Sequence, residues 1–540
     1  MKRSVILSIF ACFAAFSLSA QAIEGLRIAW DRSSEVKIAH HGNYARIIML
    51  EDNSFLATFE HAGSACISSS ADLLNWSSPR PIISSHHGWS GGLDWHVHVA
   101  NPELCLTKDG TLLLAVNYRP SGPVNYPFSI VLCRSEDGGV TWSSPDVLYC
   151  AGLDFNNGCW EPSFLQLPDG RIHLYFANEG PYTHSEEQEI SVMTSDDDGR
   201  TWSEPQTVSF RRNHRDGMPV AALLGNEIIL AIEDNADGKF KPYTVRTAVS
   251  DAWTETIDGK SAFRKRALAD HVEMSVYMGA PYIAVLHSGE TLLSYQTTEG
   301  RHGDWDLSCM EVAVSDSAAV DFTKRTRPFD VPDGRSGKWN SLCVIDDNTI
   351  AAVTSTDKDG VVAPYVIKGH LLRPAHISEC SESSEHMFVG SKSRDNLTVG
   401  VGRCKRSYVF NARVSDSYVA SSDGVVFMID VTGKDNTSPQ KGVYKVSIDH
   451  SGNVTKVLEG NHGQWEQCSM YVSRTEVTHT SEGYSLRLIM KFRGCRKACP
   501  YVRVSAAHRN ANSDDSTYIE HLVHSDPENP STWLKMSIKH

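Results

Sequence analysis

The sequence has no excess of basic residues. Its 540 residues include 51 Lys and Arg against 65 Asp and Glu, which gives a formal net charge of -14. Nucleic acids and anionic membranes select for basic surfaces, so this charge argues against both as partners. Hydrophobic residues make up 41% of the chain and charged residues 21%, as in ordinary globular proteins, and the length allows more than one domain.

Long apolar runs are missing except at the N-terminus. There Lys2 and Arg3 precede an apolar stretch that is too short for a membrane span, and small residues follow it up to Ala22. We therefore expect a signal peptide over residues 1–22 and a secreted or periplasmic protein, with no membrane insertion after cleavage. A lipoprotein linked through Cys12 is the less favoured alternative because the residues before it form a poor lipobox.

The thirteen cysteines lack the spacing of a zinc site, and we expect neither a metal nor a cofactor. Export would permit disulfides, for which the pairs Cys133 with Cys150 and Cys495 with Cys499 are noted, but the sequence does not fix their connectivity. Buried free thiols explain the same residues equally well.

No long helical period is present, and short runs of β-branched and aromatic residues alternate with turn residues. Six segments share one pattern: an apolar strand, a turn containing Gly or Asn, and a second apolar strand. The turns lie at Asn53, Gly110, Gly170, Gly225, Gly289 and Asn348, about 60 residues apart. This pattern predicts an all-β fold, with a six-bladed β-propeller favoured over two stacked sandwiches because the step is regular.

A second motif has the form S-x-D-x-G-x-T-W. It occurs at 135–142 and 195–202, with a shorter, degraded copy at 70–76. These segments resemble the Asp-box, or BNR repeat, of sialidase-type propellers. The Asp would cap its own turn, the Gly would take an unusual φ and the Trp would pack between sheets, so we interpret these Asp residues as structural.

The pattern changes near residue 375. We assign 23–375 to the propeller, as the catalytic domain, and 376–540 to a β-sandwich. The strand-like segments 406–416, 424–430 and 442–449 resemble carbohydrate-binding module family 9, which implies glycan binding. A sandwich with a purely structural role is the alternative.

The aligned repeats predict a ring of residues at one mouth of the central tunnel. Counting back nine positions from each turn gives Tyr44, Asn101, Glu161, Asp216, Ala280 and Trp339. The second strands return to the same mouth and end in Glu60, Tyr118, Arg119, Asn178, Glu179, Glu233, Asp234, Tyr295 and Gln296. Carboxylates, Arg and aromatic side chains in one place suit a sugar site. The plainer explanation is that strand ends are exposed and therefore polar.

The segment 158–163, Gly-Cys-Trp-Glu-Pro-Ser, resembles the W-E-P segment of glycoside hydrolase family 93, the exo-acting arabinanases. Segments 187–190, 215–219 and 232–234 also look like that family. The resemblance covers roughly residues 25–372. It implies a six-bladed propeller that acts on α-1,5-linked arabinan with retention, and it places the two catalytic carboxylates at Glu161 and Glu233.

Retention requires one carboxylate as nucleophile and one as acid/base. Glu161 lies next to Trp160, where desolvation would raise its pKa, so we assign Glu161 as acid/base and Glu233 as nucleophile. The alternatives are a structural ion pair between Glu161 and Arg215, and an exposed strand end at Glu233.

Further residues are candidates for substrate binding through hydrogen bonds or stacking. They are Arg46, Asn101, Trp160, Arg215, Asp216, Tyr295 and Trp339. His96 and His98 would share one face of a strand and bind sugar or a metal, although no third ligand is evident. We expect sugar specificity to depend on the loops 84–98, 178–189 and 298–306.

Two other functions compete with an exo-acting glycoside hydrolase on an arabinan-like poly- or oligosaccharide. A sialidase would need three Arg for the substrate carboxylate, for which Arg46, Arg215 and Arg301 are the candidates. A non-catalytic glycan-binding protein is the other. The sequence leaves the oligomeric state open.

Overall fold

The computed structural model describes residues 24–123, 125–316, 318–377, 385–390, 394–404, 407–469, 472–491, 499–511 and 517–538. The expected signal peptide, Cys12 and Cys495 lie outside these ranges. Within them the regular structure is almost entirely strand, joined by turns and loops, which confirms the predicted all-β class. The helices of the described ranges are three short 3-10 turns, and none has the length or apolar character needed to cross a bilayer.

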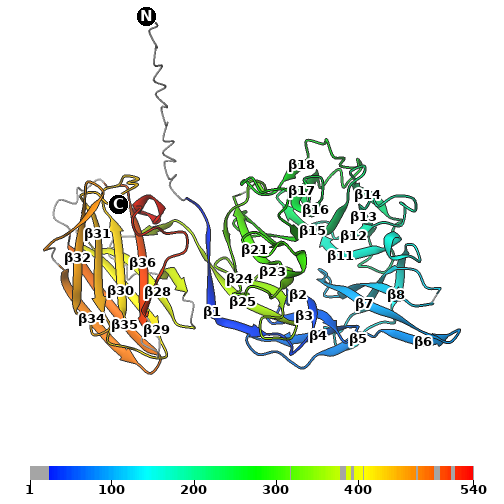
Figure 1. Cartoon of the computed structure of the whole chain (residues 1–540), viewed down its shortest axis with the longest axis horizontal. Helices are drawn as coiled ribbons and strands as arrows, with labels where there is room; N and C mark the ends of the chain where they lie inside the picture. Colours follow the sequence, from blue (N-terminus) through cyan, green and yellow to red (C-terminus); the bar gives the residue numbers. More distant parts are fainter. Residues whose placement is uncertain are drawn as a thin grey trace, which may run out of the picture.

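Six small antiparallel sheets occupy residues 27–372, and in the last one β1 pairs with β25 (Figure 1). In pairing order, the first sheet contains β2 (Asn43–Met49), β3 (Phe55–His61), β4 (Ser64–Ser70) and β5 (Arg80–Ile83), and the second contains β6 (His86–Ser90), β7 (Leu93–Leu106), β8 (Leu112–Ser121), β9 (Ser129–Ser135) and β10 (Asp146–Cys150). The third contains β11 (Cys159–Gln166), β12 (Ile172–Asn178), β13 (Glu189–Ser195) and β14 (Gln206–Ser209), and the fourth contains β15 (Asp216–Leu224), β16 (Glu227–Asp234), β17 (Lys241–Ala248) and β18 (Arg264–Arg266). The fifth contains β19 (Met278–Val285), β20 (Thr291–Thr297), β21 (Cys309–Ser315) and β22 (Thr323–Thr326), and the sixth contains β23 (Gly337–Val344), β24 (Thr349–Thr356), β25 (Ala363–Leu372) and β1 (Arg27–Lys37).

These six sheets follow one another in a cycle. The strands β2, β7, β11, β15, β19 and β23 each contact the next, and β23 contacts β2. The last sheet draws its fourth strand, β1, from the N-terminal end of the region, so the two ends of the region are held in one sheet. Apolar side chains fill the spaces between successive sheets.

Local sequence explains the turns that follow β2, β7, β11, β15, β19 and β23. Five of the six predicted turn residues have the positive φ that Gly and Asn tolerate. Asn348 is the exception, and there the carboxylate of Asp346 accepts the Asn348 N–H at 2.7 Å. The turn between β23 and β24 therefore has a different backbone conformation from the other five, although it joins its strands in the same order.

The S-x-D-x-G-x-T-W segments form self-contained turns. In one of them Asp137 accepts hydrogen bonds from the backbone and hydroxyl of Thr141 at 2.8 and 2.6 Å, and the indole of Trp142 donates to the carbonyl of Gly139. Asp197 makes the same contacts with Thr201. Both carboxylates are therefore engaged within their own turns.

Two further sheets form the C-terminal region. One contains β26 (Ala375–Ile377), β38 (Leu534–Ile538), β36 (Tyr501–Ala511), β30 (Gly424–Asp430), β31 (Val443–Asp449), β32 (Val454–Asn461) and β33 (Gln464–Gln467), with β37 (Thr517–His521) beside β36. The other contains β27 (Glu385–Gly390), β28 (Asn396–Cys404), β29 (Ser407–Ser415), β35 (Gly483–Lys491) and β34 (Val472–Thr480). The sheets pack face to face, and the rings of Phe410 and Phe427 meet across the core at 5.1 Å. The short helix η3 (Pro530–Thr532) precedes β38.

A buried junction joins the ring of sheets to this sandwich. Arg27 of β1 donates to the carbonyl of Val523 and to the hydroxyl of Ser525, each at 3.3 Å. Ala29 and Leu372 belong to the same apolar cluster as the sandwich core. The two regions therefore share packed side chains across their junction.

Candidate functional site

Each of the strands β2, β7, β11, β15, β19 and β23 contains a bulge, where its pairing register with the next strand shifts. A residue other than Gly occupies the left-handed region at every bulge. These residues are Tyr44 (φ 54°), Asn101 (49°), Glu161 (50°), Met218 (51°), Ala280 (50°) and Trp339 (57°). Such a backbone is unfavourable for ordinary residues. Because all six sheets share it, it belongs to the fold and does not single out a catalytic residue.

Five of these residues are the ring positions predicted from the turns. The bulge residue of the fourth sheet, Met218, is not one of the predicted positions. Met218 occupies the bulge, whereas the count gives Asp216. Two residues separate the last paired positions of β15 and β16, against five for β11 and β12. The shorter turn moves the fourth repeat out of alignment by two residues.

Side chains of the neighbouring sheets hold these bulges. The N–H of Asn101 donates to Glu60, that of Ala280 to Glu233, and that of Trp339 to Gln296, each at 2.8 Å. The N–H of Tyr44 donates to the hydroxyl of Ser355 at 3.0 Å. In each case the acceptor belongs to the preceding sheet. There it lies opposite the residue that comes just before that sheet's own bulge residue. Several polar strand ends therefore serve as backbone caps.

Glu161 departs from this pattern. The matching position in the third sheet is Ala177, which has no polar side chain to reach the next bulge. Instead, the backbone of Met218 lowers the pKa of Glu161 against the effect of burial. Glu161 is thus a ring carboxyl that β11 carries at the bulge itself.

A cavity of about 240 Å³ lies over this ring. Its lining combines carboxylates, two Arg and aromatic rings: Asn43, Tyr44, Glu60, Asn101, Arg119, Phe155, Trp160, Glu161, Glu179, Gln188, Arg215, Glu233, Phe240 and Trp339. Of the catalytic and substrate-binding candidates, the cavity brings together Glu161, Glu233, Asn101, Trp160, Arg215 and Trp339. Four other residues predicted at this mouth also line it: Tyr44, Glu60, Arg119 and Glu179. Arg46, Asp216 and Tyr295 do not line it.

The two predicted catalytic carboxyls have raised pKa values. Burial raises the pKa of Glu161 to about 8, opposed by Arg119 and reinforced by the charges of Glu233 and Glu179. Burial also raises the pKa of Glu233 to about 7, although the Ala280 N–H favours its charged form. The charge of Glu233 thus acts on the ionisation of Glu161, and Glu161 keeps its proton to the higher pH.

Both Arg of the cavity already have partners. Arg119 donates to the side chains of Asn117, at 2.7 Å, and Asn101, and its guanidinium lies 4.9 Å from the Trp160 ring. Arg215 forms an ion pair with Glu179. The alternative in which Arg215 pairs with Glu161 is therefore not what the structure contains.

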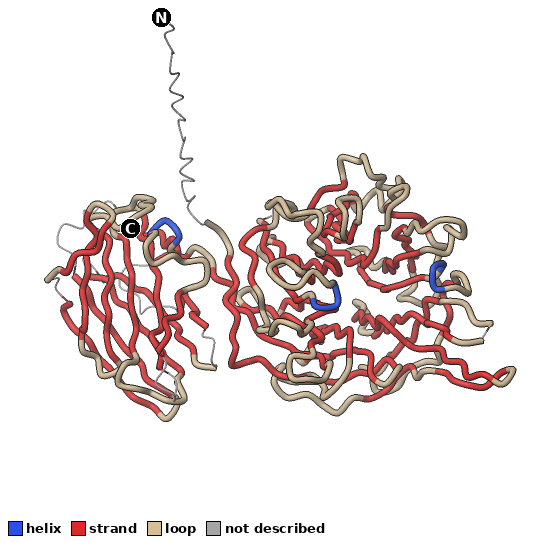
Figure 2. Tube along the Cα trace, viewed as in Figure 1, coloured by secondary structure: helices blue, strands red, loops and turns tan. Residues whose placement is uncertain are grey.

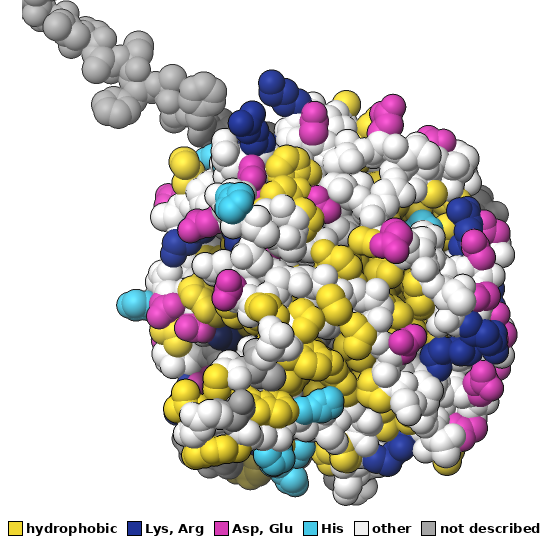
Figure 3. Space-filling model, turned by 90° about the vertical axis from the view of Figure 1, so that its right-hand side faces the viewer, with side chains coloured by type: hydrophobic (Ala, Val, Ile, Leu, Met, Phe, Trp, Pro, Cys, Tyr) yellow, Lys and Arg dark blue, Asp and Glu magenta, His cyan; other side chains and the backbone are white. Residues whose placement is uncertain are grey.

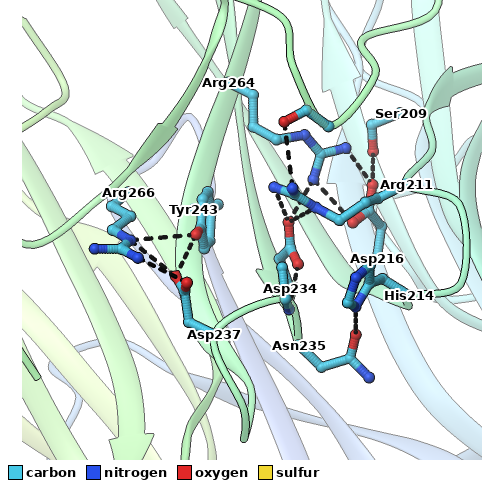
Figure 4. Close-up of polar contacts among 12 residues, drawn as sticks. Ser209, Arg211, His214, Asp216, Asp234, Asn235, Asp237, Tyr243, Arg264 and Arg266 are labelled. Carbon is cyan, nitrogen blue, oxygen red and sulfur yellow. Dashed lines mark hydrogen bonds and ion pairs between the residues drawn. The ribbon is translucent and has the colours of Figure 1, made fainter. Parts of the chain in front are cut away.

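Asp216 lies away from the cavity, in a buried ion-pair network (Figure 4). Arg264 binds it through two nitrogens at 2.9 and 2.6 Å, and Ser209 donates to it at 2.9 Å. The same guanidinium binds Asp234, which Arg211 also contacts. Since Asp216 precedes the bulge, its side chain points to the outer side of the strand rather than to the ring.

Arg46 and Tyr295 also differ from their predicted positions. Arg46 is buried beneath the ring of Tyr44, at 4.0 Å, and forms an ion pair with Glu103 at 3.1 Å. Tyr295 is fully buried and donates to Glu311 at 3.0 Å. Both side chains support the cavity floor or the sheet packing, because strand residues alternate between the two faces of a sheet.

Glu233 has neighbours that sequence reasoning missed. A methyl group on Gly279 would meet both the Tyr277 hydroxyl and the Glu233 carboxylate, and one on Gly217 would lie 3.1 Å from Glu233. Gln296 donates to the Tyr277 hydroxyl at 3.0 Å. Gly directly before a bulge in two successive repeats is a signal that could have located this close approach.

Two exposed aromatic side chains at the cavity mouth were also missed. Phe155 starts the helix η1 (Phe155–Asn157) and lies 4.9 Å from Trp160. Trp305 starts η2 (Trp305–Leu307) and lies 6.4 Å from Trp339. Figure 2 shows both short helices in the ring region. Trp305 falls in a loop predicted to govern specificity, but nothing in the sequence marked Phe155.

His96 and His98 project from one face of β7, as predicted for a strand, and their rings stack at 5.5 Å. Within the described ranges, no three His, Cys, Asp or Glu side chains are grouped so as to hold a metal ion. Cys133 and Cys150 are free thiols.

No protein-family model and no curated protein sequence matches the chain. Solved structures resemble it weakly. A Dyadobacter fermentans protein of unknown function has 16% identity and a TM-score of 0.49 over 64% of this chain and 100% of its own. The GH93 α-L-arabinofuranosidase of Fusarium graminearum, in complex with arabinobiose, has 16% identity and a TM-score of 0.45 over 64% and 97%. A Trypanosoma rangeli sialidase has 10% identity and a TM-score of 0.42 over 91% and 86%.

Proposed function

We propose that residues 27–372 form a six-bladed β-propeller and that its cavity hydrolyses a glycosidic bond at the end of a glycan chain. The observation that carries this proposal is the pair Glu161 and Glu233. Two carboxyls with raised pKa values share a cavity walled by aromatic rings. Sugar sites combine stacking surfaces with acid–base groups in this way. The cyclic order of the six sheets supports the propeller.

We propose retention with Glu161 as acid/base and Glu233 as nucleophile, and the order of the two pKa values supports these roles. Between about pH 7 and pH 8, Glu161 is protonated and able to give its proton to the leaving oxygen, while Glu233 is mostly ionised. The Ala280 N–H aims the Glu233 carboxylate at the cavity. After a glycosyl-enzyme forms on Glu233, the ionised Glu161 takes a proton from water, which then attacks the sugar carbon.

The charges of the cavity favour a neutral sugar. Four carboxyl groups, Glu60, Glu161, Glu179 and Glu233, face two Arg that are already paired. A sialic acid needs Arg for its carboxylate, but Arg46 lies beneath the cavity and Arg301 donates to backbone carbonyls. A neutral α-1,5-arabinan, which the resemblance to family 93 implies, is therefore favoured over a sialoglycan.

The test is product release from defined glycans. We expect arabinose or arabinobiose from linear arabinan, no release of sialic acid from sialyllactose, and retained anomeric configuration by NMR. Glu161→Gln and Glu233→Gln keep an oxygen that accepts the backbone N–H, so they should stay folded while kcat falls by about 10²–10⁴. Unaltered activity in both variants would overturn the assignment. Binding without any product would favour the non-catalytic alternative.

For the remaining regions we propose export through residues 1–22 and glycan binding by the sandwich, as its resemblance to family 9 implies. Export is tested by the mass of the mature protein, which should begin after Ala22. Glycan binding by the sandwich is tested by affinity electrophoresis of the variant Trp339→Ala. This variant weakens glycan binding in the ring cavity, so that the binding which remains reports on the sandwich. Continued retardation in arabinan gels supports binding by the sandwich, and complete loss contradicts it.

A further inference from the structure

The second sheet carries a β-hairpin arm formed by β6 and the start of β7. Gly91 and Gly92 make its tip, with φ of 62° and 84° at the two turn residues, as a tight two-residue hairpin requires. β8 pairs with β7 only as far as Ser121 opposite His96. Beyond that point the arm is two-stranded and projects past the neighbouring sheets, at the right of Figure 1. The predicted specificity loop 84–98 is therefore mostly strand.

The two faces of the arm differ. On one face the Trp95 indole covers Gly88, where any added methyl group would strike it, and His86 packs against Tyr118 at 5.3 Å. Trp95 is therefore half-buried on this face, whereas His86 and Leu93 remain exposed. Gly at position 88 is needed because Trp95 lies directly against its backbone.

The other face is open and carries a row of rings. His96 stacks on His87 at 5.9 Å and on His98 at 5.5 Å, with interplanar angles of 26° and 16°. Trp89 follows His87 on the same face by strand alternation, and 68% of its side-chain surface is exposed. Figure 3, viewed from the side on which the arm projects, shows histidine side chains beside apolar ones. Large exposed aromatic groups of this kind mark interaction sites.

This row of rings leads to the cavity. His98 pairs in register with Arg119, which lines the cavity. The charges of Arg119 and His98 both act on Glu60, a further cavity residue, by lowering its pKa against the effect of burial. Asn101, also in the cavity, follows His98 by three residues on β7. The open face of the arm therefore borders the cavity at His98 and Arg119.

We propose that Trp89, His87, His96 and His98 form an outer platform for the sugar residues that follow the one held in the cavity. An indole offers a stacking surface for a sugar ring, and imidazoles both donate and accept hydrogen bonds with hydroxyls. The occupant is the same neutral glycan chain, since the surface borders a cavity rich in carboxyl groups. This inference rests on the proposed glycoside hydrolase function and extends it to the length of substrate that the enzyme prefers.

The experiment compares kcat/KM for arabinotriose and linear arabinohexaose in the wild type, in Trp89→Ala and in His96→Ala. We expect the preference for the hexaose to fall about tenfold in each variant, mainly through KM. His287→Ala, which changes an exposed histidine outside the cavity lining, is the matched control and should keep the wild-type preference. Equal losses on both substrates, or no loss on either, would overturn the platform.

A second measurement separates this inference from the proposed function. If no glycan is hydrolysed, the proposed function fails, and retardation of the wild type and Trp89→Ala in arabinan gels still tests the platform. Weaker retardation of the variant supports it, and equal retardation overturns it. A change from dimer to monomer in Trp89→Ala, or Zn²⁺ binding that depends on His96 without any change in glycan binding, would assign the open face another occupant and overturn the proposal.

Discussion

The ring of sheets and the C-terminal sandwich are built from similar short strands, yet the cavity that gathers Glu161 and Glu233 lies in the ring. In the ring, each of the strands β2, β7, β11, β15, β19 and β23 has a bulge that shifts its pairing register and turns one side chain toward the centre. In the middle of the sandwich, β29 pairs with β28 and β35, and β30 with β36, without a shift, whereas its register shifts lie in the outer pairs β27–β28, β31–β32 and β34–β35. Regular alternation there sends apolar side chains into a closed core. The comparison shows that the candidate site lies where the strand pairing is interrupted.

The largest expected difference between the two regions comes from paired glycine substitutions. Gly279→Ala places a methyl group against Tyr277 and Glu233, whose flexible ends can move, so kcat/KM should fall about a hundredfold with little loss of stability. Gly424→Ala places it against the Ile448 carbonyl, which cannot move, so unfolding should become easier by about 1–3 kcal/mol with little change in kcat/KM. Kinetics and thermal denaturation measure both. A loss of stability in Gly279→Ala together with a loss of kcat/KM in Gly424→Ala would contradict the comparison.

The pH profile sharpens the assignment of the ring carboxyls. Activity should rise as Glu233 ionises near pH 7 and fall as Glu161 loses its proton near pH 8. Because Arg119 lowers the pKa of Glu161, Arg119→Gln should move the alkaline limb to higher pH and leave the acid limb in place. An alkaline limb that stays in place would show that Glu161 is not the acid.

A buried carboxyl in the sandwich should affect stability and not catalysis. Burial raises the pKa of Asp416 to about 6, and the nearby charges of Asp395 and Asp423 act in the same direction. The folded state then binds a proton more tightly than the unfolded state, so stability should fall as pH rises from about 4 to 6. Asp416→Asn should reduce this dependence and raise Tm at pH 7, as measured by calorimetry. A lower Tm for the variant at pH 7 would contradict this account.

The smallest effect should be shared by both regions. Asp137 in the ring and Asp449 in the sandwich each accept backbone N–H groups within their own turn. Replacing either by Ala should lower Tm by a few degrees and leave kcat unchanged, since neither carboxylate lines the cavity. A loss of kcat in Asp137→Ala would show that its turn positions the cavity.

Sequence patterns located much of the site because turns and strand alternation are local properties. The turns place Glu161, Asn101 and Trp339 at equivalent positions, and the structure puts all three in the cavity. Asp216 was misplaced because a turn two residues long was aligned with longer ones. Phe155 was missed because its ring reaches the mouth from a 3-10 turn outside the repeat.

By itself the sequence determined the all-β class, the six repeated hairpins and the turns that cap themselves, since these depend on hydrogen bonds between residues near one another in the chain. Only the tertiary structure decided which polar groups share the cavity. Glu233 and Ala280 belong to different sheets, and Arg119 reaches Trp160 across another boundary. Burial between sheets also raises the pKa values of Glu161 and Glu233, because desolvation depends on how the whole ring packs around them.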